Sequence, residues 1–259
     1  MIEIIILFIA GIGAGVITGL FGASAVMFAG PVLILFLGYD VYLAIGLALG
    51  IDVFASLTAS IVYKKNKNVE IAKSLPFLAF ALIGVLVGSY FSQFVPSSSL
   101  SFFEGIAIFA IGVSIFRRKK RSSSNKKKGK RFSRNVRFSL LVLLGVCVGL
   151  IAGVFGAGGG LMILLTLLFV LNYDTHKAIG TSVVLMIFIA LFGAIGHYAI
   201  LPFDFYMILL GGIGGVIGAW GSAEFANRVD EKVLNRIVGI ILGVLGLCLF
   251  LKEVGGVWI

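Results

Sequence analysis

Residues 145–172 read GVCVGLIAGVFGAGGGLMILLTLLFVLN, an apolar run that nevertheless has glycines at positions 153, 156, 158, 159 and 160. Each glycine inside a helix costs about 0.5–1 kcal/mol relative to alanine. A helix that simply crosses a membrane has no reason to collect its weakest helix formers near its middle. The cluster therefore predicts a built-in break between two helical pieces.

The same run occurs a second time earlier in the chain. A constant offset places Gly11 on Gly145, and the match continues to positions near both ends of the two copies. The chain therefore consists of two copies of one unit, residues 1–116 and 139–259, joined by the stretch 117–138. Glycine-interrupted apolar segments at matching places in two halves are typical of the central binding site of a secondary transporter. Further matched pairs are Gly15 and Gly149, Gly19 and Gly153, Gly22 and Gly156, Tyr39 and Tyr173, Asp40 and Asp174, and Gly112 and Gly246.

Composition assigns the chain to the membrane. Of its 259 residues, 60% are apolar and only 12% are charged, and the mean hydropathy is +1.15. Soluble proteins carry about 25% charged residues. The net charge of +10 comes from basic residues gathered between apolar segments, which indicates orientation in a lipid bilayer and argues against nucleic-acid binding. Cys147 and Cys248 lie inside apolar segments and provide neither a disulfide framework nor a metal-ligand spacing.

Two topologies fit the apolar segments. Residues 3–37 and 139–171 are each longer than the roughly 20 residues needed to cross a bilayer, so each is one long helix or a glycine-broken hairpin, full or re-entrant. Three further spans follow in each unit. Single crossings would make the units parallel, whereas hairpins would invert the second unit relative to the first. The expected spans are 41–63, 74–95 and 99–116 in the first unit and 178–200, 205–226 and 233–251 in the second.

The basic residues favour the inverted arrangement. It leaves only Lys252 outside the cell, because cytoplasmic loops carry the excess of Lys and Arg. We therefore predict an all-α polytopic protein of the cell membrane with two inverted repeats, each a glycine-broken hairpin plus three transmembrane helices. Its basic linker is expected in the cytoplasm and its termini outside. The parallel arrangement would place Lys177, Arg228, Lys232 and Arg236 outside.

The glycine cluster is the expected substrate site. A half-helix that begins there would present free backbone N–H groups, and its dipole adds about half a positive charge. Such a site binds a small anion without any arginine. Close helix packing through small residues is the alternative, and we assign it to the glycines at 145, 149 and 153. The expected substrate-binding residues are Gly156, Gly158, Gly159 and Gly160, with Gly22, Ala23 and Ser24 at the matching place in the first unit.

Four further polar residues are candidates within the spans. The hydroxyls of Thr181 and Ser182 can donate to an oxyanion or bond to their own helix backbone. Asp52 lies near the centre of its span, where a charge costs about 3 kcal/mol, and it is either a proton carrier or a neutral, hydrogen-bonded acid. His197 is either a structural hydrogen-bonder or a proton relay. Asp52 and His197 are therefore candidates for proton coupling, although their counterparts in the other unit are Met186 and Tyr63.

Four motifs together resemble the TauE/SafE family of membrane permeases, known as sulfite exporters. They are GVFGAGGG at 153–160, HKAIGTS at 176–182, GAIGHYAI at 193–200 and GGIGGVIGAWGSAEFANRV at 211–229. The resemblance covers nearly the whole chain and implies export of small sulfur-containing anions such as sulfite or organosulfonates. The first unit departs from the pattern, because its GLFGASAV at 19–26 lacks the glycine triplet. The implied substrate residues are Gly156, Gly158, Gly159, Gly160, Thr181 and Ser182, with His197 as a further family-like position.

The function predicted from these features is secondary transport of a small anion by alternating access, with a proton as a possible coupling ion. No cofactor or metal is expected, and the chain has no phosphate-binding loop for ATP. A passive anion channel is a second interpretation. An intramembrane enzyme is a third, although the sequence has no HExxH motif, no Gly-x-Ser-x-Gly elbow and no paired carboxylates. The expected partners are the anion, the coupling proton and the lipid bilayer, and not nucleic acid.

Overall fold

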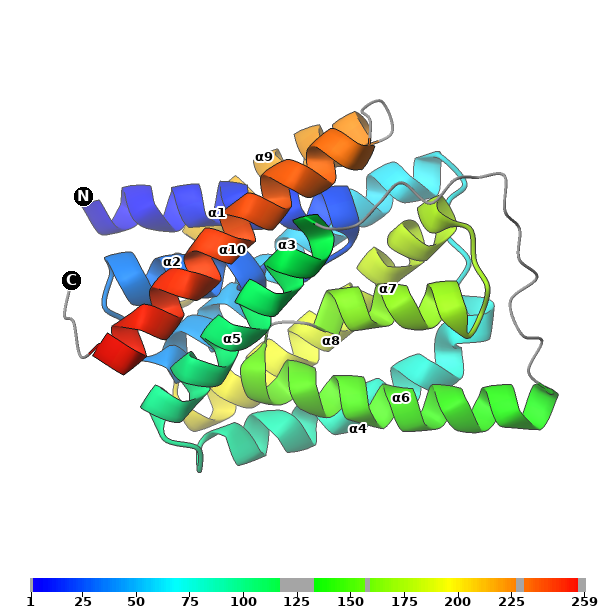
Figure 1. Ribbon diagram of the computed structural model, residues 1–259, viewed down its shortest axis with the longest axis horizontal. Helices are drawn as coiled ribbons and strands as arrows, with labels where there is room; N and C mark the ends of the chain where they lie inside the picture. The colour runs from blue at the N-terminus through cyan, green and yellow to red at the C-terminus, as the bar shows by residue number, and fades with distance from the viewer. Residues whose placement is uncertain (1, 117–132, 157–158, 227–230, 256–259) are drawn as a thin grey trace.

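The computed structural model describes residues 2–116, 133–156, 159–226 and 231–255, and these residues form helices joined by short loops, with no strand among them (Figure 1). The predicted all-α class is confirmed. Most of the predicted linker, residues 117–132, lies outside the described residues. The first half contains α1 (Ile2–Phe21), α2 (Val26–Phe36), α3 (Val41–Lys65), the short 3-10 helix η1 (Ala72–Ser74), α4 (Leu75–Ser92) and α5 (Ser97–Phe116); the second contains α6 (Arg134–Phe155), α7 (Gly159–Phe169), α8 (Thr175–Ile200), α9 (Phe205–Ala226) and α10 (Glu231–Gly255).

Both long apolar stretches break at a glycine in the left-handed conformation. Gly22 follows α1 with φ +62°, and Gly156 follows α6 with φ +61°. Their N–H groups still donate to Thr18 and Ala152, at 2.9 Å in both cases, so each glycine closes the last turn of its helix. A residue with a Cβ rarely adopts this conformation, which explains why both copies have glycine at the break.

The helices that follow the breaks are too short to cross a membrane. α2 and α7 have 11 residues each, which corresponds to about 16 Å, whereas the hydrocarbon core is about 30 Å thick. Each hairpin therefore consists of a long helix and a half-helix. Within the described residues, the helices long and apolar enough to cross are Ile2–Phe21, Val41–Lys65, Ala72–Ser92, Asn135–Phe155, His176–Ile200 and Phe205–Ala226. The predicted spans 99–116 and 233–251 are not among these helices and stay predictions.

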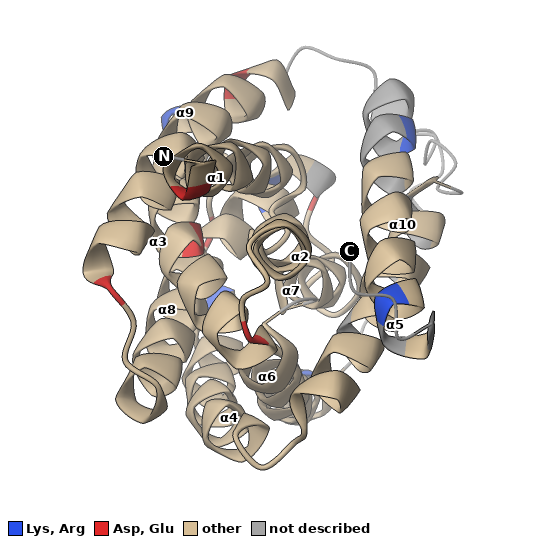
Figure 2. Cartoon of the chain, turned by 90° about the vertical axis from the view of Figure 1, so that its left-hand side faces the viewer, with Lys and Arg blue, Asp and Glu red and all other residues tan. Residues whose placement is uncertain are grey.

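The long helices surround the two half-helices. α3 packs against α8, while α1 packs along α9, α4 along α6 and α5 along α10. In Figure 2, α2 and α7 lie in the middle of this ring. In the internal repeat, α1 to α5 correspond in order to α6 to α10. Exchanging each helix for its counterpart converts the α1–α9 pair into the α6–α4 pair. The α3–α8 and α5–α10 pairs are unchanged by this exchange. In Figure 1, α1 runs from left to right and α6 from right to left. The inverted repeat stays a prediction, and this arrangement supports it.

Glycines allow the paired helices to approach closely. A Cβ added at Gly149 would lie 2.2 Å from the carbonyl oxygen of Ala81, and one added at Gly153 would lie 2.3 Å from that of Val85. On the other side of the molecule, a Cβ at Gly11 would lie 1.9 Å from the oxygen of Gly211. These contacts confirm that the regularly spaced glycines at 145, 149 and 153 serve helix packing.

Most of the described basic residues lie at one end of the molecule. The Lys177 ammonium is 3.6 Å from the Glu70 carboxylate, which puts the start of α8 beside the loop between α3 and α4. A parallel arrangement would separate these two residues by the thickness of the membrane. Figure 2 looks onto the opposite end, where acidic positions lie around the N-terminus and a basic position lies on α10. Assignment of the basic end to the cytoplasm stays a prediction.

Candidate functional site at the hairpin tips

The tips of the two broken hairpins touch each other. The Ser24 hydroxyl is 3.4 Å from the carbonyl oxygen of Gly156, and a Cβ added at Gly160 would lie 2.5 Å from the backbone nitrogen of Ser24. Ala23 also borders this contact and is buried. The structure therefore brings together the glycine cluster of the second half and the matching segment of the first.

The Asp52 carboxyl group lies at the centre of these tips. Its fully buried carboxylate accepts hydrogen bonds from the hydroxyls of Ser24, at 2.8 Å, and of Thr18, at 3.2 Å. A third hydroxyl, that of Ser56, donates at 3.0 Å from one turn further along α3. The backbone N–H of Ala25, which immediately precedes α2, also donates at 3.0 Å. The carboxylate thus sits at the positive end of the first half-helix, surrounded by donors.

The second half carries an apolar side chain at the corresponding place. Met186 aligns with Asp52 and Gly159 aligns with Ala25 in the internal repeat. The terminal methyl of Met186 lies 4.0 Å from the position that a Cβ on Gly159 would take, and Met186 is fully buried. The start of α7 therefore has no carboxylate from position 186, whereas the start of α2 has one from position 52.

Ser182 contacts the tip of the first hairpin. Its hydroxyl donates to Ile179 in its own helix at 2.8 Å and lies 3.4 Å from the carbonyl oxygen of Gly22. A Cβ on Gly22 would lie 2.3 Å from this hydroxyl, so only glycine fits at that point. Ser182 is consequently a neighbour of the central site, although its proton is directed to backbone carbonyls.

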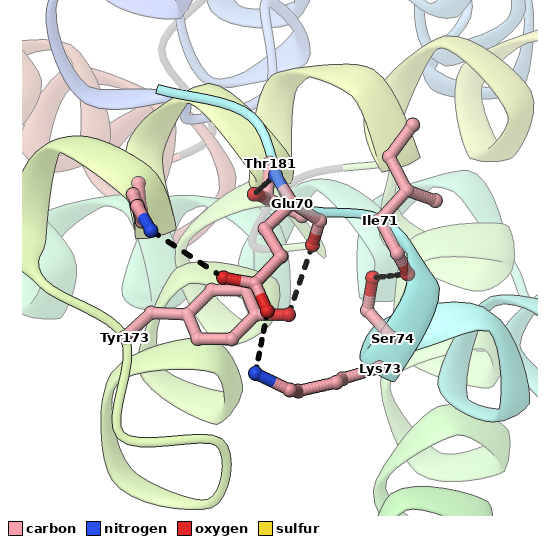
Figure 3. A network of polar contacts seen from close by, with 7 residues as sticks. Glu70, Ile71, Lys73, Ser74, Tyr173 and Thr181 are labelled. Atoms are coloured by element: carbon pink, nitrogen blue, oxygen red, sulfur yellow. Dashed lines mark hydrogen bonds and ion pairs between the residues drawn. The ribbon is translucent and has the colours of Figure 1, made fainter. Parts of the chain in front are cut away.

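Thr181 lies in a different polar network, at the basic end. Its hydroxyl oxygen accepts the N–H of Glu70 at 3.0 Å, while the Tyr173 hydroxyl donates to the Glu70 carbonyl at 2.9 Å (Figure 3). The Glu70 carboxylate is paired with Lys73 and Lys177. Thr181 therefore anchors the loop between α3 and α4, and its predicted contact with the substrate stays a prediction.

The basic residues around Glu70 lower the pKa of its carboxyl group. The hydrogen bond from Lys73 holds the pKa of the Glu70 carboxyl below its ordinary value of 4.5, with further lowering from the charges of Lys73 and Lys177. Desolvation raises this pKa, but by less than the hydrogen bond from Lys73 lowers it. Burial raises the pKa of the nearby Tyr173 phenol to about 12. This end of the protein therefore keeps Glu70 ionised and Tyr173 protonated at neutral pH.

His197 is buried well away from the hairpin tips. It lies fifteen residues beyond Ser182 on α8, which corresponds to about 22 Å along the helix. Its Nδ1 is 3.0 Å from the carbonyl oxygen of Gly193, and its ring lies 4.4 Å from that of Tyr42. Its Nε2 is buried without a hydrogen-bond partner. Since the carbonyl can only accept, Nδ1 carries a proton and Nε2 of the neutral ring is a free acceptor.

Sequence reasoning missed three of the four donors to Asp52. Thr18, Ser56 and the N–H of Ala25 were not recognised, although Ser56 stands one turn after Asp52 and Ser24 was a candidate.

The predicted site residue Gly158 lies outside the described residues. Within the described part of the chain, no group of three or more His, Cys, Asp or Glu side chains could hold a metal ion.

Helices of membrane-spanning length around two half-helices whose tips meet define a multi-pass membrane protein of the transporter type. The family model described as Sulfite exporter TauE/SafE matches residues 7–249, and the chain belongs to this family of membrane transporters.

Curated relatives cover almost the full length of the chain. A probable membrane transporter protein of Bacillus subtilis, YdhB, is 25% identical over 253 residues, which are 96% of this chain and 99% of YdhB. A second Bacillus subtilis protein of the same description, YunE, is 23% identical over 92% of each chain. The probable membrane transporter protein MJ0441 of Methanocaldococcus jannaschii is 26% identical over 95% of each chain. No solved structure matches the chain.

Proposed function

We propose that the protein is a secondary transporter that exports a small sulfur-containing oxyanion, sulfite or a small sulfonate, across the cell membrane. The description of the family as sulfite exporters supports the substrate class, and the relatives named as probable membrane transporters support transport. The hairpin tips near mid-membrane are where a transporter built from two related halves binds its substrate.

The position of Asp52 is the observation that carries this proposal. Its carboxylate is an oxyanion held by one backbone N–H and three hydroxyls at the start of a half-helix. Sulfite and sulfonates offer similar oxygen acceptors and need similar donors. In the second half, Met186 leaves the start of α7 without that carboxylate. We assign the substrate to this end of α7, where Gly159 and Gly160 let the half-helix begin close to Ala152 and to the tip of the first hairpin.

The contact between the tips supports alternating access as the mechanism. The Ser24 hydroxyl lies between the Asp52 carboxylate and the Gly156 carbonyl, so one small cluster joins both hairpins. Movement of one half against the other opens a path toward one end of the molecule while the tips close the other. Protonation of Asp52 would convert an acceptor into a donor and weaken its bond from Ala25, which gives a route for proton coupling. The basic end faces the cytoplasm in this scheme.

Transport by the reconstituted protein tests the proposal. Uptake of radiolabelled sulfite and of a small sulfonate into proteoliposomes is measured with and without a pH gradient. We expect saturable flux and accumulation against the anion's gradient when a pH gradient is imposed. Unsaturable flux that only dissipates the gradient would instead indicate a passive channel. Absence of flux for both anions, in protein shown to be folded, would contradict the proposed substrate class.

A matched pair of glycine variants locates the site. A Cβ at Gly159 would lie 2.9 Å from that of Ala152, whereas a Cβ at Gly221 on α9 meets nothing within 4 Å. We expect Gly159→Ala to lower the transport rate and Gly221→Ala to leave it unchanged. Equal transport by both variants would argue that the start of α7 does not bind the substrate.

A further inference from the structure

A cavity of about 530 Å³ lies at the basic end, away from the hairpin tips. It is bordered by η1 and the start of α4 on one side and by the first turns of α6 on the other. Its lining contains both polar and apolar residues. The polar side chains are Lys73, Asn135, Arg137 and Ser139, and the larger apolar ones include Pro76, Phe138 and Leu171.

Arg137 lines this cavity. Its Nε atom is enclosed by the protein, so a ligand in the cavity would contact the other guanidinium nitrogens. The guanidinium is a planar fork that suits two oxygens of a phosphate or carboxylate. Lys73, on the opposite side of the cavity, is paired with Glu70. Lys73 and Arg137 make the lining of the cavity basic, which favours an anionic ligand.

The ends of two helices add to the positive potential of the cavity. α4 begins at Leu75 and α6 begins at Arg134, and these two helices pack along each other. Both therefore direct their N-terminal ends toward the same cavity. Helix N-termini carry partial positive charge and free N–H groups, which favour an oxyanion. The helix ends and the two basic side chains thus indicate the same class of ligand by independent routes.

We propose that this cavity binds the phosphate of an anionic phospholipid. A free oxyanion would use only the polar side of the lining, whereas a lipid would also cover Pro76 and Phe138 with its glycerol and acyl chains. Phe138 is 54% exposed and Leu75 is 52% exposed, so the cavity opens onto an apolar outer face. Basic pockets between transmembrane helices near a membrane surface are suited to lipid headgroups. The lipid would fasten the start of α6 to that of α4, beside the Glu70 network.

Native mass spectrometry of the delipidated full-length protein tests this assignment. The protein is titrated with dioleoyl phosphatidylglycerol, which is anionic, and with dioleoyl phosphatidylcholine, which has no net charge. The variants are Arg137→Gln and Arg137→Lys, which keeps the charge but loses the planar guanidinium fork. Arg236→Gln is the matched control, because Arg236 lies on α10 over the ring of Phe116 and is not part of the cavity lining. Parallel titrations add inorganic phosphate and sulfite as competitors.

We expect the wild-type protein and Arg236→Gln to prefer phosphatidylglycerol by about tenfold, since a charge-assisted hydrogen bond is worth about that factor. Arg137→Gln should lose this preference, and Arg137→Lys should lose part of it. Retention of the full preference by Arg137→Gln would overturn the proposal. Displacement of the bound lipid by millimolar phosphate or sulfite would also overturn it, because the occupant would then be a free oxyanion. Failure of sulfite transport would leave the lipid result unaffected.

Discussion

The carboxylate of Asp52 accepts a hydrogen bond of 3.0 Å from the backbone N–H of Ala25, so the first half of the protein supplies its own anion to its half-helix. The counterpart of Ala25 is Gly159, which faces the methyl of Met186. The two halves thus differ at the start of the half-helix, where the first has the Asp52 carboxylate and the second has the Met186 side chain. This asymmetry predicts one substrate site, at the start of α7, and a structural anion at the start of α2.

The contact between the hairpin tips depends on the absence of a side chain at Gly160. We expect Gly160→Ala to lower the free energy of unfolding by about 1–3 kcal/mol, because its Cβ would lie 2.5 Å from the backbone of Ser24. Gly243→Ala is the control, since a Cβ there meets nothing within 4 Å. Thermal unfolding in detergent measures both. Equal melting temperatures would show that the tips do not pack as described.

The inverted arrangement predicts which loops share a side of the membrane. With Cys147 and Cys248 first replaced by serine, Lys67→Cys and Lys177→Cys should react with an impermeant maleimide from the same side, because Glu70 pairs with Lys177. Lys252→Cys should react from the other side, since the Lys252 ammonium lies 3.3 Å from the carbonyl oxygen of Ile34 at the end of α2. Labelling of positions 67 and 177 from opposite sides would support parallel units.

The ion pairs of Glu70 predict a stability that depends on pH. Because Lys73 and Lys177 lower the pKa of Glu70 in the folded state, the carboxylate stabilises the protein above its unfolded-state pKa of about 4.5. This stabilisation is lost as the pH falls through the lower folded-state pKa. The wild-type protein should therefore melt above Glu70→Gln at pH 7, and the difference should shrink below pH 4.5. A difference that stays constant across this range would contradict the ion pairs.

His197 offers a free acceptor that a proton relay needs. His197→Asn keeps a side-chain donor for the Gly193 carbonyl and removes the unpartnered Nε2. We expect this variant to transport at a rate similar to that of the wild-type protein without a pH gradient and to lose the stimulation by a gradient. Proteoliposome flux at matched protein density measures both conditions. Unchanged stimulation would show that His197 has a structural role beside Tyr42.

The sequence predicted the fold well because its signals are local. Hydrophobic length located the spans at α3, α4, α8 and α9. The glycine cluster located the break after α6, and the internal repeat carried that break to the end of α1. The half-helical length of α2 and α7 was left open, since apolar character alone does not separate a full hairpin from a re-entrant one. The surroundings of Asp52 depend on Thr18, Ser24 and Ser56, which only the packing of α1, α2 and α3 brings together. Thr181 and Ser182 are sequence neighbours but face different networks, because adjacent residues of a helix point about 100° apart.

Met186→Asp is the most direct test of the central claim that the start of α7 holds the transported anion. A carboxylate at position 186 would occupy this end as Asp52 occupies the start of α2, and it would exclude the substrate by competition and by charge repulsion. We predict that the folded variant loses sulfite or sulfonate uptake by at least about tenfold, which corresponds to about 1.4 kcal/mol of binding. Met186→Leu should retain uptake, and Met186→Asn, which is neutral, should retain more than Met186→Asp. Wild-type uptake by folded Met186→Asp would contradict the account.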